Sequence, residues 1–146
     1  MKTPPERAVI SVMLAVADAP AAVQWYKDAL DAQVQWDLGS VAALNILGAP
    51  IFLGEPEGNG WETPGRRGLP TCRVELFCDD PDAVIARAVD HGAAGSADPI
   101  RNHAAPWGEH RQGGFVDPFG HVWLVGDRSP IDPQNRHLSG KDAKEG

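Results

Sequence analysis

The amino-acid sequence predicts an α+β fold made of two βαβββ modules joined by a linker. Three observations support this prediction: a strand-and-helix unit occurs twice, three strand-like segments follow each copy, and both copies end in the same short pattern. We place the modules at residues 8–54 and 71–127 and the linker at residues 55–70. Residues 1–7 and 128–146 are polar and contain prolines, so we expect them to be tails.

The repeated unit is visible in the segments SVMLAVADAPAAVQWYKDALDA (11–32) and RVELFCDDPDAVIARAVDHGA (73–93). In each, an alternating apolar strand leads to an aspartate and then to an amphipathic helix. Asp18 and Asp80 stand where an N-cap carboxylate accepts hydrogen bonds from the first free N–H groups of a helix. The positions where a left-handed residue is expected to end the helices are Asp31 and Gly92.

Three strand-like segments follow each helix. They lie at 34–38, 41–47 and 50–53 in the first module and at 95–100, 114–117 and 121–125 in the second. The final strands align without a gap, because GAPIFLGE and GHVWLVGD each contain a turn glycine, an apolar strand and a Gly-acid end. The linker, EPEGNGWETPGRRGLP, is rich in Gly and Pro, and this composition disfavours regular structure.

Composition and charge exclude several classes of protein. The net charge of −7 argues against nonspecific nucleic-acid binding and favours neutral or cationic ligands. No apolar run approaches the roughly 20 residues that cross a bilayer, and the N-terminus lacks a signal peptide's apolar core, so we expect no membrane partner and a cytoplasmic location. Cys72 and Cys78 lie on one expected strand, about 20 Å of chain apart, too far for a disulfide, so we expect free thiols.

Several features together resemble the vicinal oxygen chelate superfamily, which includes glyoxalase I, extradiol dioxygenases, fosfomycin-resistance enzymes, bleomycin-resistance proteins and PhnB-like proteins. These features are the strand-Asp-helix openings, the Trp107-Gly108 pair before Arg111 and Gly113, and DPFGHVW at 117–123. The resemblance covers about residues 8–127 and is nearest to the PhnB-like and bleomycin-resistance types. It implies sheets that curl around a cleft and a homodimer, often with modules exchanged between subunits.

In metal-using members, the resemblance implies ligands on the first and last strand of each module. Mapped through the repeat, these positions are Ser11 and Phe52 in the first module and Arg73 and Leu124 in the second. A divalent metal needs imidazole, carboxylate or thiolate donors, and the Arg73 cation repels it. We therefore expect no metal and no other cofactor.

The resemblance then implies a cleft that binds a small molecule without metal. Trp36, Trp61 and Trp107 offer flat faces for an aromatic ligand, although they could instead hold loops or a dimer interface together. The expected ligand-binding residues are Ser11, Trp36, Phe52, Trp61, Arg73, Trp107 and Leu124. The function that this pattern favours is sequestration of an antibiotic or metabolite by a homodimer, with affinity from apolar burial and no reaction.

A rival hypothesis is a lyase, isomerase or other glyoxalase-like enzyme that uses acid–base residues or an atypical metal site. Its candidates are His103, Glu109 and His110, in a segment that we interpret as a loop. Glu109 beside His110 could hold the imidazole as an oriented base, or both could be solvated loop residues. We expect His121 to play a structural part at the start of the last strand, and a third alternative is a scaffold with a vestigial cleft.

Overall fold

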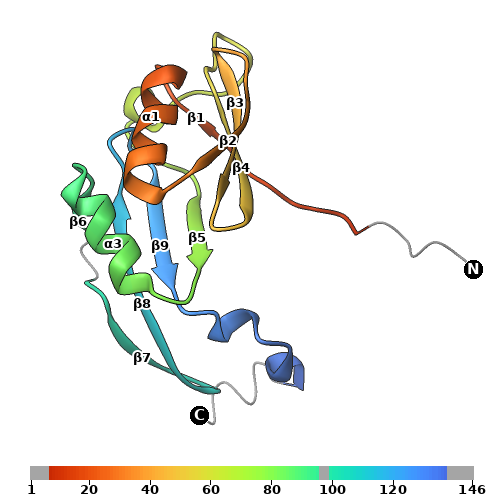
Figure 1. Ribbon diagram of the computed structural model, residues 1–146, viewed down its shortest axis with the longest axis vertical. Helices are drawn as coiled ribbons and strands as arrows, with labels where there is room; N and C mark the ends of the chain where they lie inside the picture. Colours follow the sequence, from red (N-terminus) through yellow and green to blue (C-terminus); the bar gives the residue numbers. More distant parts are fainter. Residues whose placement is uncertain (1–6, 96–98, 138–146) are drawn as a thin grey trace, which may run out of the picture.

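The structure is a computed structural model that describes residues 7–95 and 99–137 (Figure 1). It has the predicted α+β architecture, with two mixed sheets and two main helices. The first sheet has the strand order β1-β4-β3-β2. Its strands are β1 (Met13–Ala15), β2 (Gln33–Asp37), β3 (Val41–Ile46) and β4 (Ala49–Gly54).

The second sheet has the strand order β5-β9-β8-β6, and β7 pairs with the outer part of β8. Its strands are β5 (Arg73–Phe77), β6 (Ala94–Gly95), β7 (Arg101–Ala105), β8 (Gly108–Val116) and β9 (Val122–Gly126). In both halves the first and last strands run parallel, β1 beside β4 and β5 beside β9. The first half is therefore the predicted βαβββ unit, and the second repeats this order with four strands after the helix, β6, β7, β8 and β9.

The helices begin and end where the sequence predicts. They are α1 (Ala19–Leu30), α3 (Pro81–Asp90) and the short α2 (Pro64–Arg67), followed by the 3₁₀ turns η1 (Ser129–Ile131) and η2 (Pro133–His137). Asp18 and Asp80 each accept a hydrogen bond of 3.1 Å from the backbone N–H three residues on. Asp31 and Gly92 take the left-handed conformation, with φ of 54° and 100°, at the helix ends.

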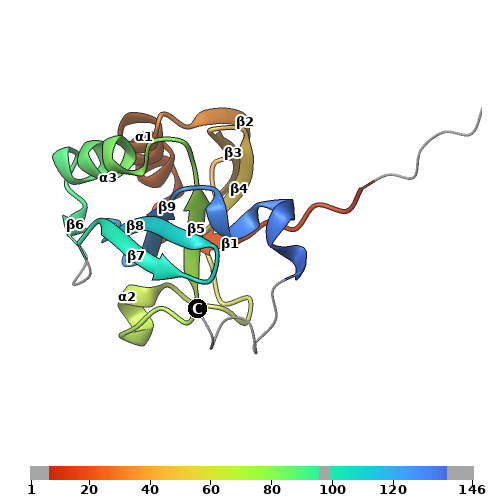
Figure 2. The same ribbon diagram turned by 90° about the horizontal axis from the view of Figure 1, so that it is seen from below.

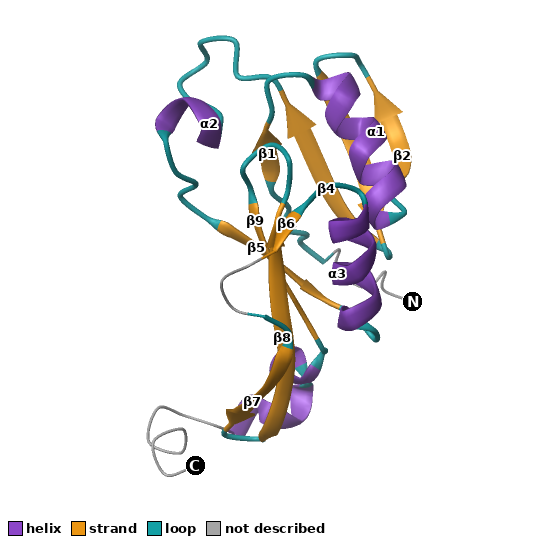
Figure 3. Ribbon diagram, turned by 90° about the vertical axis from the view of Figure 1, so that its left-hand side faces the viewer, coloured by secondary structure: helices purple, strands orange, loops and turns teal. Residues whose placement is uncertain are grey.

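One apolar core extends through both modules. Helices α1 and α3 lie side by side on the same side of the sheets (Figures 1 and 3). Trp25 of α1 donates a 2.7 Å hydrogen bond to the carbonyl of His91, and Arg87 of α3 donates one of 2.9 Å to the carbonyl of Asp28. The core includes Leu14, Tyr26, Leu53, Phe115 and Trp123.

The turn between β8 and β9 is organised by one buried carboxylate. Asp117 is 3% exposed and accepts hydrogen bonds from the Tyr26 hydroxyl, the Trp123 indole at 2.9 Å and the backbone N–H groups of Phe119 and His121. A buried charge is tolerated when donors surround it in this way. This arrangement fixes the turn to α1 and sets the position of His121.

Arg111 and Gly113, which follow the Trp107-Gly108 pair, have structural explanations. The Arg111 guanidinium on β8 contacts the Asp82 carboxylate at the start of α3 through two hydrogen bonds of 2.6 Å. The hydrogen bonds between these two side chains raise the pKa of Arg111 and lower the pKa of Asp82. Gly113 is needed because a Cβ there would lie 2.7 Å from Ile100. The motif thus joins β8 to its neighbours.

Two predictions about irregular segments are wrong, those for residues 101–111 and for the linker. Residues 101–111 form a hairpin of β7 and β8 rather than a loop, because β8 continues past its sheet and pairs with the backbone of β7 (Figure 3). The linker contains α2, which Thr63 caps and Pro64 begins. The expected tail contains η1 and η2 up to residue 137.

The remaining expectations lie partly outside the described residues. The strand expected at 95–100 includes residues 96–98, and residues 1–6 and 138–146 belong to the expected tails. Cys72 and Cys78 are free, the first exposed and the second buried. Within the described ranges, no helix is long and apolar enough to span a membrane.

Candidate functional site

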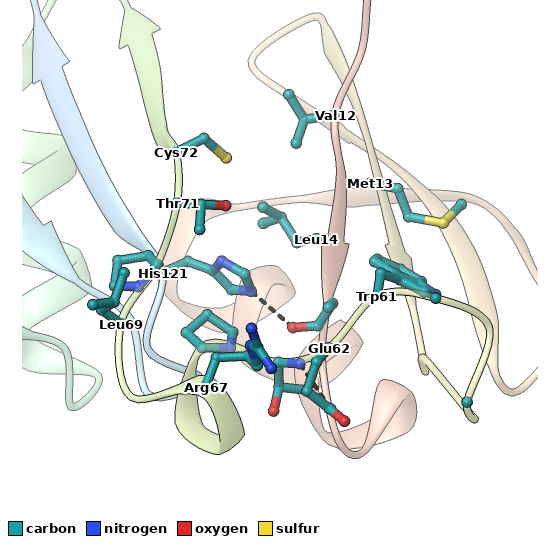
Figure 4. Close-up of a pocket in the computed structure, with 16 residues that line it drawn as sticks. Val12, Met13, Leu14, Trp61, Glu62, Arg67, Leu69, Thr71, Cys72 and His121 are labelled. Carbon is teal, nitrogen blue, oxygen red and sulfur yellow. Dashed lines mark hydrogen bonds between the residues drawn. The ribbon is translucent and has the colours of Figure 1, made fainter.

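A cavity of about 740 Å³ lies between β1 and the segment 58–72 that leads into β5 (Figure 4). Small-ligand sites occupy roughly 300–1,000 Å³, so this volume suits a small molecule. Figure 2 shows α2, at the edge of this cavity, on the opposite side of β5 from α1 and α3. Its lining includes Met13, Leu14, Trp61, Arg67, Thr71 and His121.

Trp61 forms one wall because β4 ends in a glycine. A Cβ at Gly54 would lie 3.2 Å from the Trp61 ring and 3.0 Å from the Met13 sulfur, so a side chain there would displace both. Glu62, next along the chain, accepts a 2.9 Å hydrogen bond from the Thr63 N–H. The linker that composition marks as irregular therefore builds this side of the cavity.

His121 joins the two modules beside the cavity. Its Nε2 lies 2.8 Å from the carbonyl oxygen of Ala15 on β1, and its backbone N–H donates to Asp117 at 2.9 Å. The residue is only 7% exposed. The structural part predicted for His121 agrees with these contacts, but the side chain also lines the cavity, which the sequence did not indicate.

Glu62 and Arg67, the charged residues that line the cavity, differ in whether they form an ion pair. Glu62 forms an ion pair of 3.5 Å with Arg66, one turn away. Arg67 lines the cavity, and in the part of the chain that the structure describes no ion-pair partner is found for it. The cavity thus offers a cationic fork of N–H donors to a ligand.

In the first module, the predicted ligand-binding residues lie mainly outside this cavity. Phe52 and Trp36 lie on the sheet face turned away from the helices, with ring centroids 6.0 Å apart. The Ser11 hydroxyl donates a 3.0 Å hydrogen bond to the carbonyl of Pro50. Among the seven predicted residues, only Trp61 contributes to the cavity lining.

In the second module, the predicted residues are spread along the sheet. Arg73 is exposed at the first position of β5, and Leu124 is half-buried on β9. Trp107 lies at the turn of the β7–β8 hairpin and is 36% exposed. The structure does not bring these three side chains together with Trp61.

The strand register does not pair the residues mapped as metal-ligand positions with one another. Phe52 lies beside Met13, and Leu124 lies beside Glu75, two residues later in each first strand than Ser11 and Arg73. Of this set, only Glu75 carries a good donor for a divalent ion. Within residues 7–95 and 99–137, no group of three His, Cys, Asp or Glu side chains could hold a metal ion. The residues present therefore do not fit a metal.

His110 has a different partner from the one that the sequence predicts. Its Nδ1 lies 2.7 Å from the Asp127 carboxylate, whereas Glu109 points to the opposite face of β8 because adjacent strand residues alternate. The prediction that Glu109 orients His110 is therefore wrong. His103 lies directly across the hairpin from His110. The sequence feature that could have indicated Asp127 as the partner of His110 was the Gly-acid end of the second module, to which Asp127 belongs.

The surroundings of Asp127 indicate a structural part. Burial raises its pKa, but hydrogen bonds from the Ser129 hydroxyl, the Arg111 N–H and His110 outweigh it, so the pKa lies well below its usual range. Ser129 Oγ is 3.4 Å from the same His110 nitrogen, and His110 Nε2 is buried without a partner. In a catalytic triad the carboxylate and the nucleophilic hydroxyl contact different nitrogens of the histidine, whereas here Asp127 and Ser129 both lie at Nδ1.

Residues 11–125 match the family model described as a glyoxalase-like domain. The chain belongs to this glyoxalase-like family. The family is part of the vicinal oxygen chelate superfamily that the motifs resemble. A protein of Mycobacterium bovis, described only as uncharacterized, is 33% identical over 130 residues, which cover 80% of this chain and 81% of that protein. A Mycobacterium tuberculosis protein with the same description has the same identity and is covered over 72% of its length.

Solved structures agree on the fold of this glyoxalase-like protein. TioX from Micromonospora sp. ML1 has a TM-score of 0.63 at 24% identity, covering 83% of this chain and 98% of TioX. A glyoxalase/bleomycin resistance protein from Albidiferax ferrireducens has a TM-score of 0.63 at 18% identity, covering 81% and 97%. The fosfomycin resistance protein FosX from Listeria monocytogenes, solved with Mn(II), has a TM-score of 0.62 at 17% identity, covering 83% and 90%.

Proposed function

We propose that this glyoxalase-like protein binds a small, flat, largely apolar molecule in the cavity between its modules, without a metal ion, and acts by sequestering it. The observation that carries the proposal is the cavity of about 740 Å³ walled by Trp61 and Met13. A few polar groups, from Arg67, Thr71 and His121, stand among these apolar ones. Pockets of this composition are typical of small-ligand sites.

Apolar burial supplies the affinity in this proposal. Covering apolar surface contributes roughly 25 cal/mol per Å², before the cost of ordering the ligand. A ring stacked on Trp61 adds about 0.5–1.5 kcal/mol beyond its area. No bond has to break for a protein to lower the free concentration of an antibiotic or metabolite, so binding alone is sufficient for this function.

The donor set supports the metal-free part of the proposal. FosX from Listeria monocytogenes was solved with Mn(II) and a dihydroxypropylphosphonic acid. Here Met13, Phe52 and Leu124 accompany Glu75 at the paired positions of the first and last strands. A thioether, two hydrocarbon side chains and one carboxylate do not match the donors that a divalent ion needs.

The enzyme hypothesis receives less support from the same geometry. His110 is held by Asp127, and Glu109 faces away from it. His103, Glu109 and His110 all lie on the β7–β8 hairpin, whereas the cavity is lined by β1, the linker and His121. Acid–base chemistry in the cavity would therefore need residues other than this predicted set.

We further propose that the protein is a homodimer. Several apolar side chains of the N-terminal segment and the first sheet face solvent, among them Ile10, which is 95% exposed. Exposed apolar patches of this kind commonly mark interaction surfaces. The others in these segments are Val9, Val12, Met13, Val34, Trp36, Leu38 and Leu47. Sedimentation equilibrium tests this proposal, and a monomer at high concentration would contradict it.

The binding proposal is tested by measuring the melting temperature with a panel of aromatic antibiotics and hydroxylated aromatics. A compound that binds the folded state raises the melting temperature. At a ligand concentration of a hundred times Kd, the free energy of unfolding increases by about 2.7 kcal/mol. Trp61→Ala should abolish the shift, and the matched control Trp107→Ala, on the distant hairpin, should keep it. Equal loss in both variants, or no shift with any compound, would contradict the proposal.

A further inference from the structure

The hydrogen bond between His121 and Ala15 fixes which ring nitrogen of His121 carries a proton. Nε2 lies 2.8 Å from the Ala15 carbonyl oxygen, which can only accept a hydrogen bond. Nε2 must therefore be the donor. A neutral imidazole has one N–H group, so Nδ1 keeps its lone pair and can act only as an acceptor.

The Nδ1 atom has no protein partner but is not sealed from solvent. Among the described residues, the hydrogen bonds of His121 use its backbone N–H, its backbone carbonyl and Nε2. The side-chain nitrogen that is fully buried without a partner in this part of the chain is His110 Nε2 and not His121 Nδ1. Because His121 is 7% exposed and lines the cavity, the cavity provides this access.

The close-up shows how the ring is placed. In Figure 4 a dashed line leaves one nitrogen of His121, which is the Nε2 hydrogen bond described above, and another edge of the ring faces the space near Thr71 and Leu14. The Asp117 carboxylate holds the His121 backbone at 2.9 Å, and Ala15 belongs to β1. Both ends of the side chain are thus fixed, and the acceptor is held in place before a ligand arrives.

We propose that His121 Nδ1 accepts a hydrogen bond from the ligand, so that the cavity selects aromatic molecules that carry a hydroxyl group. This inference rests on the proposed function, and it names the chemical class of the ligand. A phenolic hydroxyl is the matching donor, because its O–H is a strong hydrogen-bond donor on a flat apolar body that Trp61 can contact. Arg67, at the same cavity, favours any negative charge that develops on the phenolic oxygen.

The test compares 2-naphthol with 2-methoxynaphthalene, in which a methyl group replaces the hydroxyl hydrogen and removes the donor, by isothermal titration on the full chain. One neutral hydrogen bond changes affinity by roughly 2- to 10-fold, so 2-naphthol should bind the wild-type protein more tightly by that factor. His121→Gln keeps an N–H donor near the place of Nε2, towards Ala15, but lacks an acceptor at the place of Nδ1. We expect this variant to bind both probes equally.

Two further variants separate recognition from structure. His121→Asn places a carbonyl oxygen near the Nδ1 position and loses the contact with Ala15, so it should keep a preference for 2-naphthol while unfolding more easily. His91→Gln, at the exposed end of α3, is the matched control and should leave the preference unchanged. A preference that survives in His121→Gln would overturn the inference.

The outcomes distinguish this inference from the function on which it rests. If both probes bind the wild-type protein equally and Trp61→Ala abolishes both, the hydroxyl selection is wrong and the aromatic site stands. If neither probe binds, the aromatic site fails and the inference fails with it. Long-range proton–nitrogen NMR of the wild-type protein gives an independent reading, since a His121 ring protonated on Nδ1 and bare on Nε2 would overturn the inference without any variant.

Discussion

The hydroxyl of Tyr26 donates a hydrogen bond to the buried carboxylate of Asp117. Tyr26 belongs to α1 of the first module, and Asp117 begins the turn between β8 and β9 of the second. Burial, and then the charge of Asp117, raise the pKa of Tyr26 well above its usual value. The two modules are therefore joined through an interaction that requires a protonated phenol.

This relationship predicts how stability changes at high pH. Because the pKa of Tyr26 is raised in the folded state, its contribution to stability is complete below the unfolded pKa, about 10, and is lost as the pH rises above it. The chain has one tyrosine, so tyrosinate absorbance reports this group alone. We expect that absorbance to appear together with loss of the tertiary circular dichroism. Tyrosinate that forms in the intact fold near pH 10 would contradict the assignment.

The two ends of this hydrogen bond should differ in their importance for stability. Tyr26→Phe removes one donor and leaves Asp117 with three others, so we expect a loss of about 1–2 kcal/mol in the free energy of unfolding. Asp117→Ala leaves several buried donors without an acceptor and should cost about 3 kcal/mol or more. Urea unfolding measures both values. Equal losses would show that Asp117 does not organise the turn.

Gly126 on β9 should tolerate no side chain. A Cβ there would lie 2.6 Å from Cε1 of His110, which Asp127 holds in place. We expect Gly126→Ala to lower the free energy of unfolding by about 1–3 kcal/mol. Gly95→Ala on β6 is the matched control, because nothing lies within 4 Å of an added Cβ there, and it should change stability by less than about 0.5 kcal/mol. Similar effects in chemical denaturation would contradict the close contact.

Asp127 should matter most when it is ionised. Its pKa is lowered in the folded state, so its contribution is present above the unfolded pKa, about 4, and is lost as the pH falls through the lower folded value. We expect Asp127→Asn to reduce stability by about 1 kcal/mol near neutral pH, given the partial exposure of the side chain. The difference from wild type should shrink in acid. If the stability difference between wild type and Asp127→Asn instead grew below about pH 4, this prediction would be contradicted.

Much of the fold was predictable because local chemistry determines it. The capping aspartates, the left-handed Asp31 and Gly92 and the repeated apolar strands each depend on residues close in the sequence. The β7–β8 hairpin was missed because its pairing depends on backbone partners rather than on strand-forming side chains, since Ala and Asn are poor indicators of strands.

The site was less predictable because it is assembled from distant segments. Trp61 was identified, but the link between His121 and Ala15 spans 106 positions, and no local pattern indicates it. The repeat could not indicate the strand register, which places Met13 beside Phe52 and Glu75 beside Leu124. Adjacent residues in a strand diverge, which is why Glu109 does not reach His110.

The most direct test of metal-free binding is a titration of 2-naphthol into protein stripped with a chelator, repeated after Mn²⁺, Ni²⁺ or Zn²⁺ is restored. Within the part of the chain that the structure describes, no group of three His, Cys, Asp or Glu side chains could hold a metal ion, so the same Kd is expected in every condition. Binding that appears only after a divalent ion is restored, in stoichiometric amount, would contradict the account and favour a metal-dependent enzyme.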